Sequence, residues 1–151
     1  DPTEQVVVVN KGSEQGVFVG QPLLDAYGLM GQVIEVNPYF SRVLLITDSN
    51  HALPVQINRN GVRAVAEGSG DLYELKLRHV SNTVDVKVGD LLVSSGLGQR
   101  FPVGYPVADV ISILHDPGKS FATVIARPKA QLNRSRHVLL AFSGKKTGDP
   151  R

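Results

Sequence analysis

Residue types that could form a catalytic triad occur in this chain in the order histidine, aspartate, serine. His51 comes first, Asp71 or Asp85 supplies an acid, and Ser94 or Ser95 supplies a nucleophile. In a serine hydrolase the histidine takes the hydroxyl proton, the aspartate orients the histidine, and backbone N–H groups stabilise the oxyanion. A chymotrypsin-like serine hydrolase with a degenerate or cryptic active site is therefore an alternative function for the chain.

The surroundings of these serines differ from those of a hydrolase nucleophile. Ser95-Gly96 gives only the outline of a glycine-rich nucleophile turn, and the Gly-Asp-Ser-Gly-Gly type of sequence is absent. The stretch between His51 and Ser94 is also short for the intervening strands that must carry the acid. We interpret the serines as turn residues and predict that the chain has no catalytic residues and is not an enzyme.

Other chemistry-bearing motifs are equally sparse. The chain has no cysteine, and its histidines lack the spacing of a zinc site; they are His51, His79, His115 and His137. Gly96-Leu97-Gly98 lacks the following helix and the lysine of a phosphate loop, so we interpret it as a bend. The sequence predicts neither a metal site nor a bound cofactor.

The charge of the chain argues against a nucleic-acid partner. The formal net charge is +2, and the polar tail over 143–151 accounts for all of it through Lys145, Lys146 and Arg151 against Asp149. The remaining residues hold equal numbers of basic and acidic side chains, whereas phosphate binding requires a basic stripe on one face. No apolar run approaches the roughly 18 residues of a membrane span, so we expect membrane attachment only through a segment outside this chain.

The elements that would position any site are short strands. Runs of five or six residues rich in β-branched side chains recur at intervals near ten, separated by glycine and proline, which predicts an all-β fold. Gly89-Asp90 is a typical turn before a strand at Leu91, and Asn60-Gly61 is a strong hairpin signal. Pro128–Arg134 is the only plausible helix, one short element near the C-terminus.

We predict two small β-barrel-like domains of about six short strands each. Val17–Leu24 can be aligned with Val86–Val93, and this weak internal duplication favours two units of related plan. The polar turn at residues 67–71 is the candidate boundary between them. The expected organisation is an opening strand over 1–10 that pairs with either barrel, a first barrel over 11–70, a second barrel over 71–142, and a disordered polar tail over 143–151.

Six short blocks are weak individually, because they consist mostly of glycine, valine and proline, but their order and spacing are specific. They are Asn10–Ser13, Gly16-Val17 with Gly20, Gly31–Val33, Ser41–Asp48, Val88–Leu97 and Phe101–Val107. Together they resemble the extracytoplasmic part of the rod shape-determining protein MreC family. The resemblance runs from about Gln5 to Phe142.

This resemblance implies a non-catalytic scaffold of the bacterial cell-elongation machinery. Members of the family have a short cytoplasmic start, one membrane helix and a coiled coil before two periplasmic β-barrel-like domains. We therefore expect this chain to be the periplasmic domain of a single-pass inner-membrane protein whose coiled coil precedes residue 1. The implied partners are a second copy in dimers or filaments, the class B penicillin-binding transpeptidase of elongation, MreD in the membrane and, indirectly, MreB.

Four aromatic residues in predicted loops are the candidate partner or self-association surface, namely Tyr39, Phe40, Phe101 and Tyr105. Aromatic anchors contribute disproportionately to interfaces, and the edge strands of small barrels offer adhesive surfaces. The alternative is that these rings fill a core or close a barrel end, which applies most to Phe101. Binding of the glycan polymer would instead predict aromatic and acidic residues in one groove.

Overall fold

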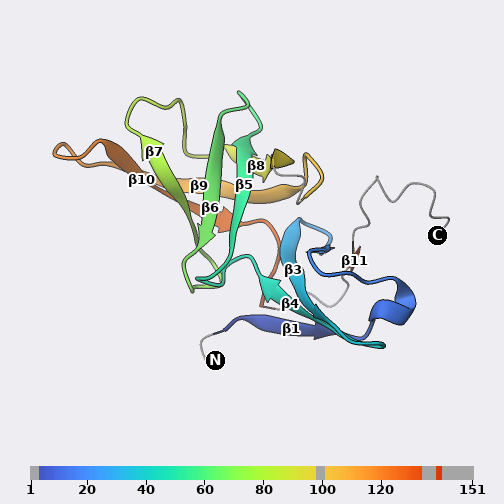
Figure 1. The fold of residues 1–151 in the computed structure, drawn as a ribbon. Coiled ribbons are helices and arrows are strands. Elements are labelled where there is room, and N and C mark those ends of the chain that lie inside the picture. Colours follow the sequence, from blue (N-terminus) through green and yellow to red (C-terminus); the bar gives the residue numbers. More distant parts are fainter. Residues whose placement is uncertain (1–3, 98–100, 134–138, 141–151) are drawn as a thin grey trace.

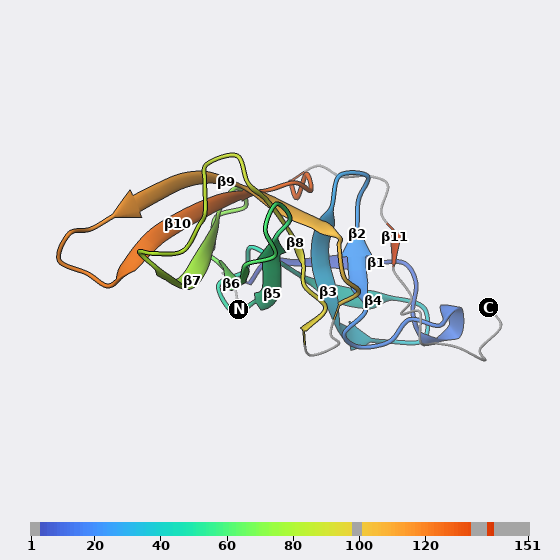
Figure 2. The same ribbon diagram turned by 90° about the horizontal axis from the view of Figure 1, so that it is seen from above.

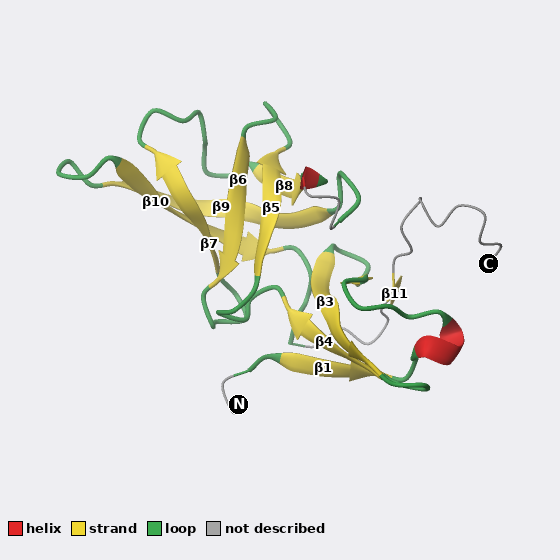
Figure 3. Cartoon of the chain, in the orientation of Figure 1, coloured by secondary structure: helices red, strands yellow, loops and turns green. Residues whose placement is uncertain are grey.

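A computed structural model describes residues 4–97, 101–133 and 139–140, and its regular structure is almost entirely β-strand (Figures 1 and 3). The all-β prediction is confirmed. The strands are β1 (Val6–Val9), β2 (Pro22–Leu24), β3 (Leu29–Val36), β4 (Ser41–Leu45), β5 (Ala52–Ile57), β6 (Arg63–Gly68), β7 (Leu75–Ser81), β8 (Leu91–Ser94), β9 (Pro106–His115), β10 (Phe121–Pro128) and β11 (Leu139–Leu140), with a 3-10 helix η1 at Ser13–Gln15.

The first unit is a five-stranded antiparallel sheet in the order β1-β4-β3-β2-β11. The opening strand belongs to this sheet, because Val6 lies opposite Leu44 and Val9 opposite Ser41 in the ladder between β1 and β4. Among the described strands β1 has no neighbour on its other side, so it forms an open sheet edge.

The second unit is a closed barrel in the order β10-β7-β6-β5-β8-β9. The predicted boundary between domains 11–70 and 71–142 is wrong, because β5 and β6 belong to this barrel and not to the first unit. The turn over 67–71 connects two strands that pair directly, with Gly68 opposite Leu75. Glycine and polar residues are typical of a hairpin turn within one barrel as well as of a linker between two domains, so the composition of this turn does not distinguish the two.

Alternation along the barrel strands explains how the chain fills its interior. Leu53, Val55 and Ile57 of β5 are buried, while the residues between them are only partly covered. A strand places successive side chains on opposite faces, so alternate positions line one core. The buried apolar side chains of the sheet and the barrel, except Val93, form one contiguous cluster.

The helix predicted over Pro128–Arg134 is absent from the described residues 128–133. Pro128 instead ends β10 opposite Ala108, and the N–H of Lys129 donates to the carbonyl of Val107 at 2.9 Å. The proline lies at a strand end, where its missing N–H is tolerated.

The sheet and the barrel lie side by side, and the hairpin of β9 and β10 reaches away from the sheet (Figures 1 and 2). Gln5 joins the two units. Its amide nitrogen donates to the carbonyl of Gly70 in the barrel at 2.7 Å, and its amide oxygen accepts from Oγ1 of Thr47 at 2.6 Å. Its backbone N–H donates to Oδ2 of Asp48 at 2.7 Å, so one side chain fixes the start of β1 to the junction.

Candidate interaction surfaces

The residues of the candidate triad do not converge. His51 is buried at the junction of sheet and barrel, where Nε2 lies 3.1 Å from Oε1 of Gln32 and the ring meets Phe101 edge-on at 6.4 Å. Oγ of Ser94 donates to the carbonyl of Pro102 at 2.6 Å and accepts the N–H of Tyr105 at 2.9 Å. These bonds use the Ser94 hydroxyl to hold the loop between β8 and β9.

The remaining candidates also have structural partners. Oγ of Ser95 accepts the N–H of Leu97 at 3.2 Å, and Asp71 accepts the N–H of Tyr73 at 2.8 Å. Both are local turn contacts of the kind that short polar side chains make. Ser94, in contrast, is the last residue of β8 and is fully buried, so its interpretation as a turn residue is wrong.

Asp85 and Asp90 share the guanidinium of Arg59. Arg59 donates to both carboxylate oxygens of Asp90 at 2.9 Å and to Oδ2 of Asp85 at 3.0 Å. The hydrogen bond from Arg59 lowers the pKa of Asp90, with burial opposing it, and the same donor lowers the pKa of Asp85. Both carboxylates are ionised and hydrogen-bonded to Arg59, and they hold the β5–β6 turn against the start of β8. They are therefore poor candidates for proton transfer.

The residues that the structure describes contain neither a metal-binding cluster nor a membrane-spanning helix. No three histidine, aspartate or glutamate side chains among them gather closely enough to hold a metal ion. In the same residues, no helix has the length and apolar character to cross a bilayer.

The four aromatic residues proposed as a surface separate into two groups. Tyr39 and Phe40 lie on the β3–β4 turn and are 68% and 42% exposed. Phe101 is 3% exposed and packs against His51, so it is a core residue and cannot act as an exposed anchor. Tyr105 is half-buried, and its backbone exchanges hydrogen bonds with Ser94.

The open edge of the first sheet is a further candidate surface. β1 consists of four valines, and Val8 at its centre is 62% exposed. A free strand edge of β-branched residues offers unpaired backbone groups and apolar side chains to another strand.

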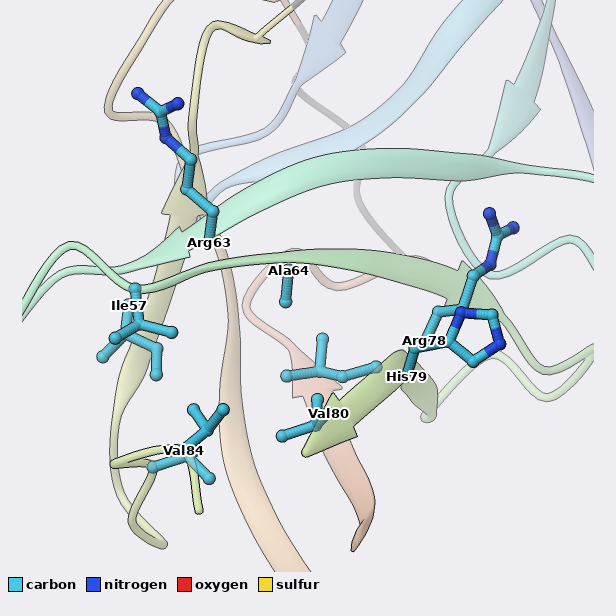
Figure 4. Close-up of a pocket in the computed structure, with 10 residues that line it drawn as sticks. Ile57, Arg63, Ala64, Arg78, His79, Val80 and Val84 are labelled. Carbon is cyan, nitrogen blue, oxygen red and sulfur yellow. The ribbon is translucent and has the colours of Figure 1, made fainter. Parts of the chain in front are cut away.

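A cavity of about 60 Å³ opens in the wall of the barrel between β6 and β7 (Figure 4). The side chains of Ile57, Ala64 and Val80 point into a shared space with Val84, whereas Arg63 points away from it (Figure 4). We call the wall segments beside this cavity, Arg63-Ala64 of β6 and His79-Val80 of β7, the barrel seam.

The seam was not predicted from the sequence, although one signal marks it. The alternation in β7 buries Leu75 and Leu77, and the next buried residue is Val80, three positions later. A break in the period of two indicates an extra residue in the strand, which is the signature of a β-bulge.

Comparison with known proteins identifies the fold. Residues 1–142 match the family model described as "Rod shape-determining protein MreC, barrel core". The cell shape-determining protein MreC of Escherichia coli is 47% identical over 148 residues, which is 98% of this chain and 40% of that protein. This chain thus spans about two fifths of the length of that relative.

Solved structures agree with this assignment. The crystal structure of MreC from Pseudomonas aeruginosa is 61% identical in sequence and has a TM-score of 0.90. The match covers 94% of this chain and 92% of the chain in that structure. MreC in a complex with penicillin-binding protein PBP2 from Helicobacter pylori is 22% identical, with a TM-score of 0.65 over 82% of this chain and 77% of its own. A periplasmic domain described as coming from the cell shape-determining filament MreC is also 22% identical, with a TM-score of 0.69. The match covers 84% of this chain and 79% of the chain in that structure.

These last two neighbours share the fold, and the family assignment itself comes from the match over 142 residues and from the more similar sequences. The chain belongs to the rod shape-determining protein MreC family.

Proposed function

We propose that this chain is a non-catalytic periplasmic scaffold that maintains rod shape by binding the class B penicillin-binding transpeptidase of cell elongation. The family match over residues 1–142 carries the proposal, because relatives in that family are named as cell shape-determining proteins. The complex of PBP2 and MreC from Helicobacter pylori supports a penicillin-binding protein as the partner. A scaffold of this kind acts by favouring one conformation of its partner through differential binding.

Self-association is the second part of the proposed role. The open edge at β1 gives a second copy a strand to pair with, and the filament named for a structural neighbour is consistent with repeated contacts between copies. We place the chain in the periplasmic part of a single-pass inner-membrane protein, with MreD as its membrane partner and MreB as an indirect cytoplasmic one.

The serine hydrolase alternative has little support from the geometry. A triad requires the histidine to accept the serine proton, whereas His51 lies beside Gln32 and the Ser94 hydroxyl is committed to the carbonyl of Pro102.

Interferometry against the periplasmic portion of the elongation transpeptidase from the same bacterium tests the proposed partnership. We expect saturable binding with a dissociation constant in the micromolar range, as is usual for contacts within dynamic assemblies. A class A penicillin-binding protein on the sensor is the control. Absence of binding at high micromolar concentrations of this chain would argue strongly against the scaffold role.

A further inference from the structure

The ladder between β6 and β7 stops before either strand ends. It runs from Gly68 opposite Leu75 to Val65 opposite Arg78. Beyond that point, among the residues that the structure describes, Arg63 and Ala64 pair only with β5, and Val80 and Ser81 pair only with β10. The barrel seam is therefore a gap in an otherwise closed wall, flanked by one unpaired strand edge on each side.

A β-bulge at His79 holds the seam open. His79 has a φ of 55°, a left-handed conformation that is costly for a residue with a side chain. Arg78 and His79 together oppose the single residue Thr123, because the register with β10 shifts between Ala122 and Val124. The His79 ring lies 5.5 Å from that of Phe121, and the adjoining Val80 is buried, so surrounding contacts fix the bulge.

The cavity inside the seam has the size of one side chain. Its floor is aliphatic, with Ile57, Leu77 and Val80 buried and Val84 half-buried. Pockets for cofactors and drug-sized ligands enclose about 300 to 1,000 Å³, far more than the 60 Å³ available here. The space thus fits a single branched aliphatic side chain, which burial in an apolar cavity would favour.

The outer rim of the cavity carries basic side chains, and that of Arg63 points outward, away from the cavity (Figure 4). Its lining includes Arg63, Arg78 and His79 and contains no carboxylate. Arg78 is already held by Glu67, whose Oε2 accepts from its Nε at 2.7 Å. Arg63 is exposed and forms no ion pair with any residue that the structure describes.

We propose that the barrel seam binds an extended acidic segment of a partner protein, which inserts one aliphatic side chain into the cavity and sets a carboxylate against Arg63. The unpaired strand edges favour an extended backbone, since a peptide adds to an exposed edge through main-chain hydrogen bonds and is selected by pockets for alternate side chains. The basic rim selects the acidic flank. The inference rests on the proposed role as a binding scaffold and specifies the chemistry of one contact.

Titration of the isotope-labelled chain with synthetic peptides, followed by NMR, tests the proposal without knowledge of the natural partner. The probe is the acetylated and amidated peptide Glu-Glu-Val-Leu-Val-Glu-Glu. We expect the largest shifts at the amides of Ala64, His79, Val80 and Val84. Two matched peptides are the controls, one with lysine replacing every glutamate and one with serine replacing the central leucine, and we expect each to bind at least about tenfold more weakly.

Variants of the chain separate specific binding from general charge attraction. Arg63→Glu should weaken binding of the acidic peptide at least about tenfold, whereas Arg127→Glu, an equal charge change at an exposed position of β10, should leave it nearly unchanged. Thermal melts confirm that both variants are folded.

Absence of shifts at the seam with roughly millimolar acidic peptide would overturn the proposal, as would equal binding of the lysine peptide or equal effects of the two variants. Shifts confined to β1 would assign the peptide to the sheet edge and overturn it too. The peptide titration needs no transpeptidase, so its result can be separated from that of the proposed function. If the acidic peptide does not bind at the seam but Arg63→Glu still binds the transpeptidase, the proposed function stands and only the seam proposal is overturned.

Discussion

Arg59 holds Asp90 through two parallel hydrogen bonds, from Nε to Oδ1 and from Nη2 to Oδ2, each 2.9 Å long. Asp90 is buried, and its Oδ2 also accepts the N–H of Lys87 at 2.8 Å. The pair links the β5–β6 turn to the start of β8, two segments that are 31 residues apart in the chain. Bidentate pairing of this kind is among the strongest charge-assisted contacts in proteins.

Asp90→Asn should lower the free energy of unfolding by about 2 kcal/mol at neutral pH, because it removes an ionised, buried acceptor from a part-buried hydrogen-bond network. The pKa of Asp90 is lowered in the folded state, mainly by Arg59. The unfolded chain therefore binds more protons between the two pKa values, so this contribution is complete above the unfolded pKa of about 4 and is lost as the pH falls through the folded value.

Urea unfolding at about pH 7 and at successively lower pH to about 2 measures this dependence. We expect the gap between wild type and Asp90→Asn to shrink on acidification. Asp116→Asn, at an exposed position in the β9–β10 turn, should give little difference at any pH. A gap that stays constant through the acidic range would contradict the assigned role of the carboxylate.

Gly68→Ala should disrupt the junction between sheet and barrel. A Cβ at position 68 would overlap the backbone carbonyl of Asp48 and crowd Thr47, and backbone atoms cannot move aside as a flexible side chain can. We expect a loss of at least about 2 kcal/mol in thermal or urea unfolding, the range for overpacking in a fixed structure. Gly118→Ala is the control, since its Cβ would meet only Oδ1 of Asp116 at 3.9 Å, and an equal loss there would refute the steric explanation.

The sequence predicted those parts of the fold that depend on neighbouring residues. Asn60-Gly61 forms the expected hairpin turn, with Gly61 at a φ of 74° and the N–H of Val62 bonded to Oδ1 of Asn60 at 3.1 Å. The alternation of Leu53, Val55 and Ile57 is equally local. Glycine conformation and side-chain period can be read from a few consecutive residues.

The features that the sequence analysis missed depend on distant contacts. β5 belongs to the barrel because Gln56 pairs with Val93, and nothing near Gln56 indicates that partner. Burial was the alternative that applied most to Phe101, but its contact with His51 is fixed by the tertiary structure and could not be predicted from nearby residues. A chain with many similar short strands allows several pairings, so local patterns could not identify the one that closes the barrel.

Ser94→Ala should weaken the fold without removing an activity. The hydroxyl bonds Pro102 and Tyr105 at once, so its removal leaves a half-buried carbonyl and a half-buried N–H without this partner, at a cost of about 1 to 3 kcal/mol. We expect no labelling of the wild-type chain by an active-site fluorophosphonate, with trypsin as the positive control. Labelling that disappears in Ser94→Ala or Ser95→Ala would establish the hydrolase alternative instead.

Tyr39→Ala and Phe101→Ala should have opposite effects on partner binding and stability. Tyr39 is exposed on the β3–β4 turn, so its truncation should leave the melting temperature nearly unchanged while weakening transpeptidase binding by about tenfold, as the loss of an aromatic anchor does. Phe101 is buried, so its truncation should cost about 3 to 5 kcal/mol of stability. Tyr27→Ala, which removes another exposed tyrosine, is the matched control; if it weakens binding as much as Tyr39→Ala does, the β3–β4 turn is not the contact.

Val8→Lys should reduce self-association through the free edge of the first sheet. β1 pairs only with β4 among the described strands, and Val8 is its most exposed residue. A lysine on an edge strand opposes the approach of a second strand by charge and by its ordered hydration, while it costs little where the side chain already faces water. Analytical ultracentrifugation over a range of protein concentrations should show a weaker association for Val8→Lys than for wild type. Val19→Lys makes the same change at an equally exposed valine outside the sheet, so equal weakening by both variants would trace the effect to net charge and exclude β1 as the interface.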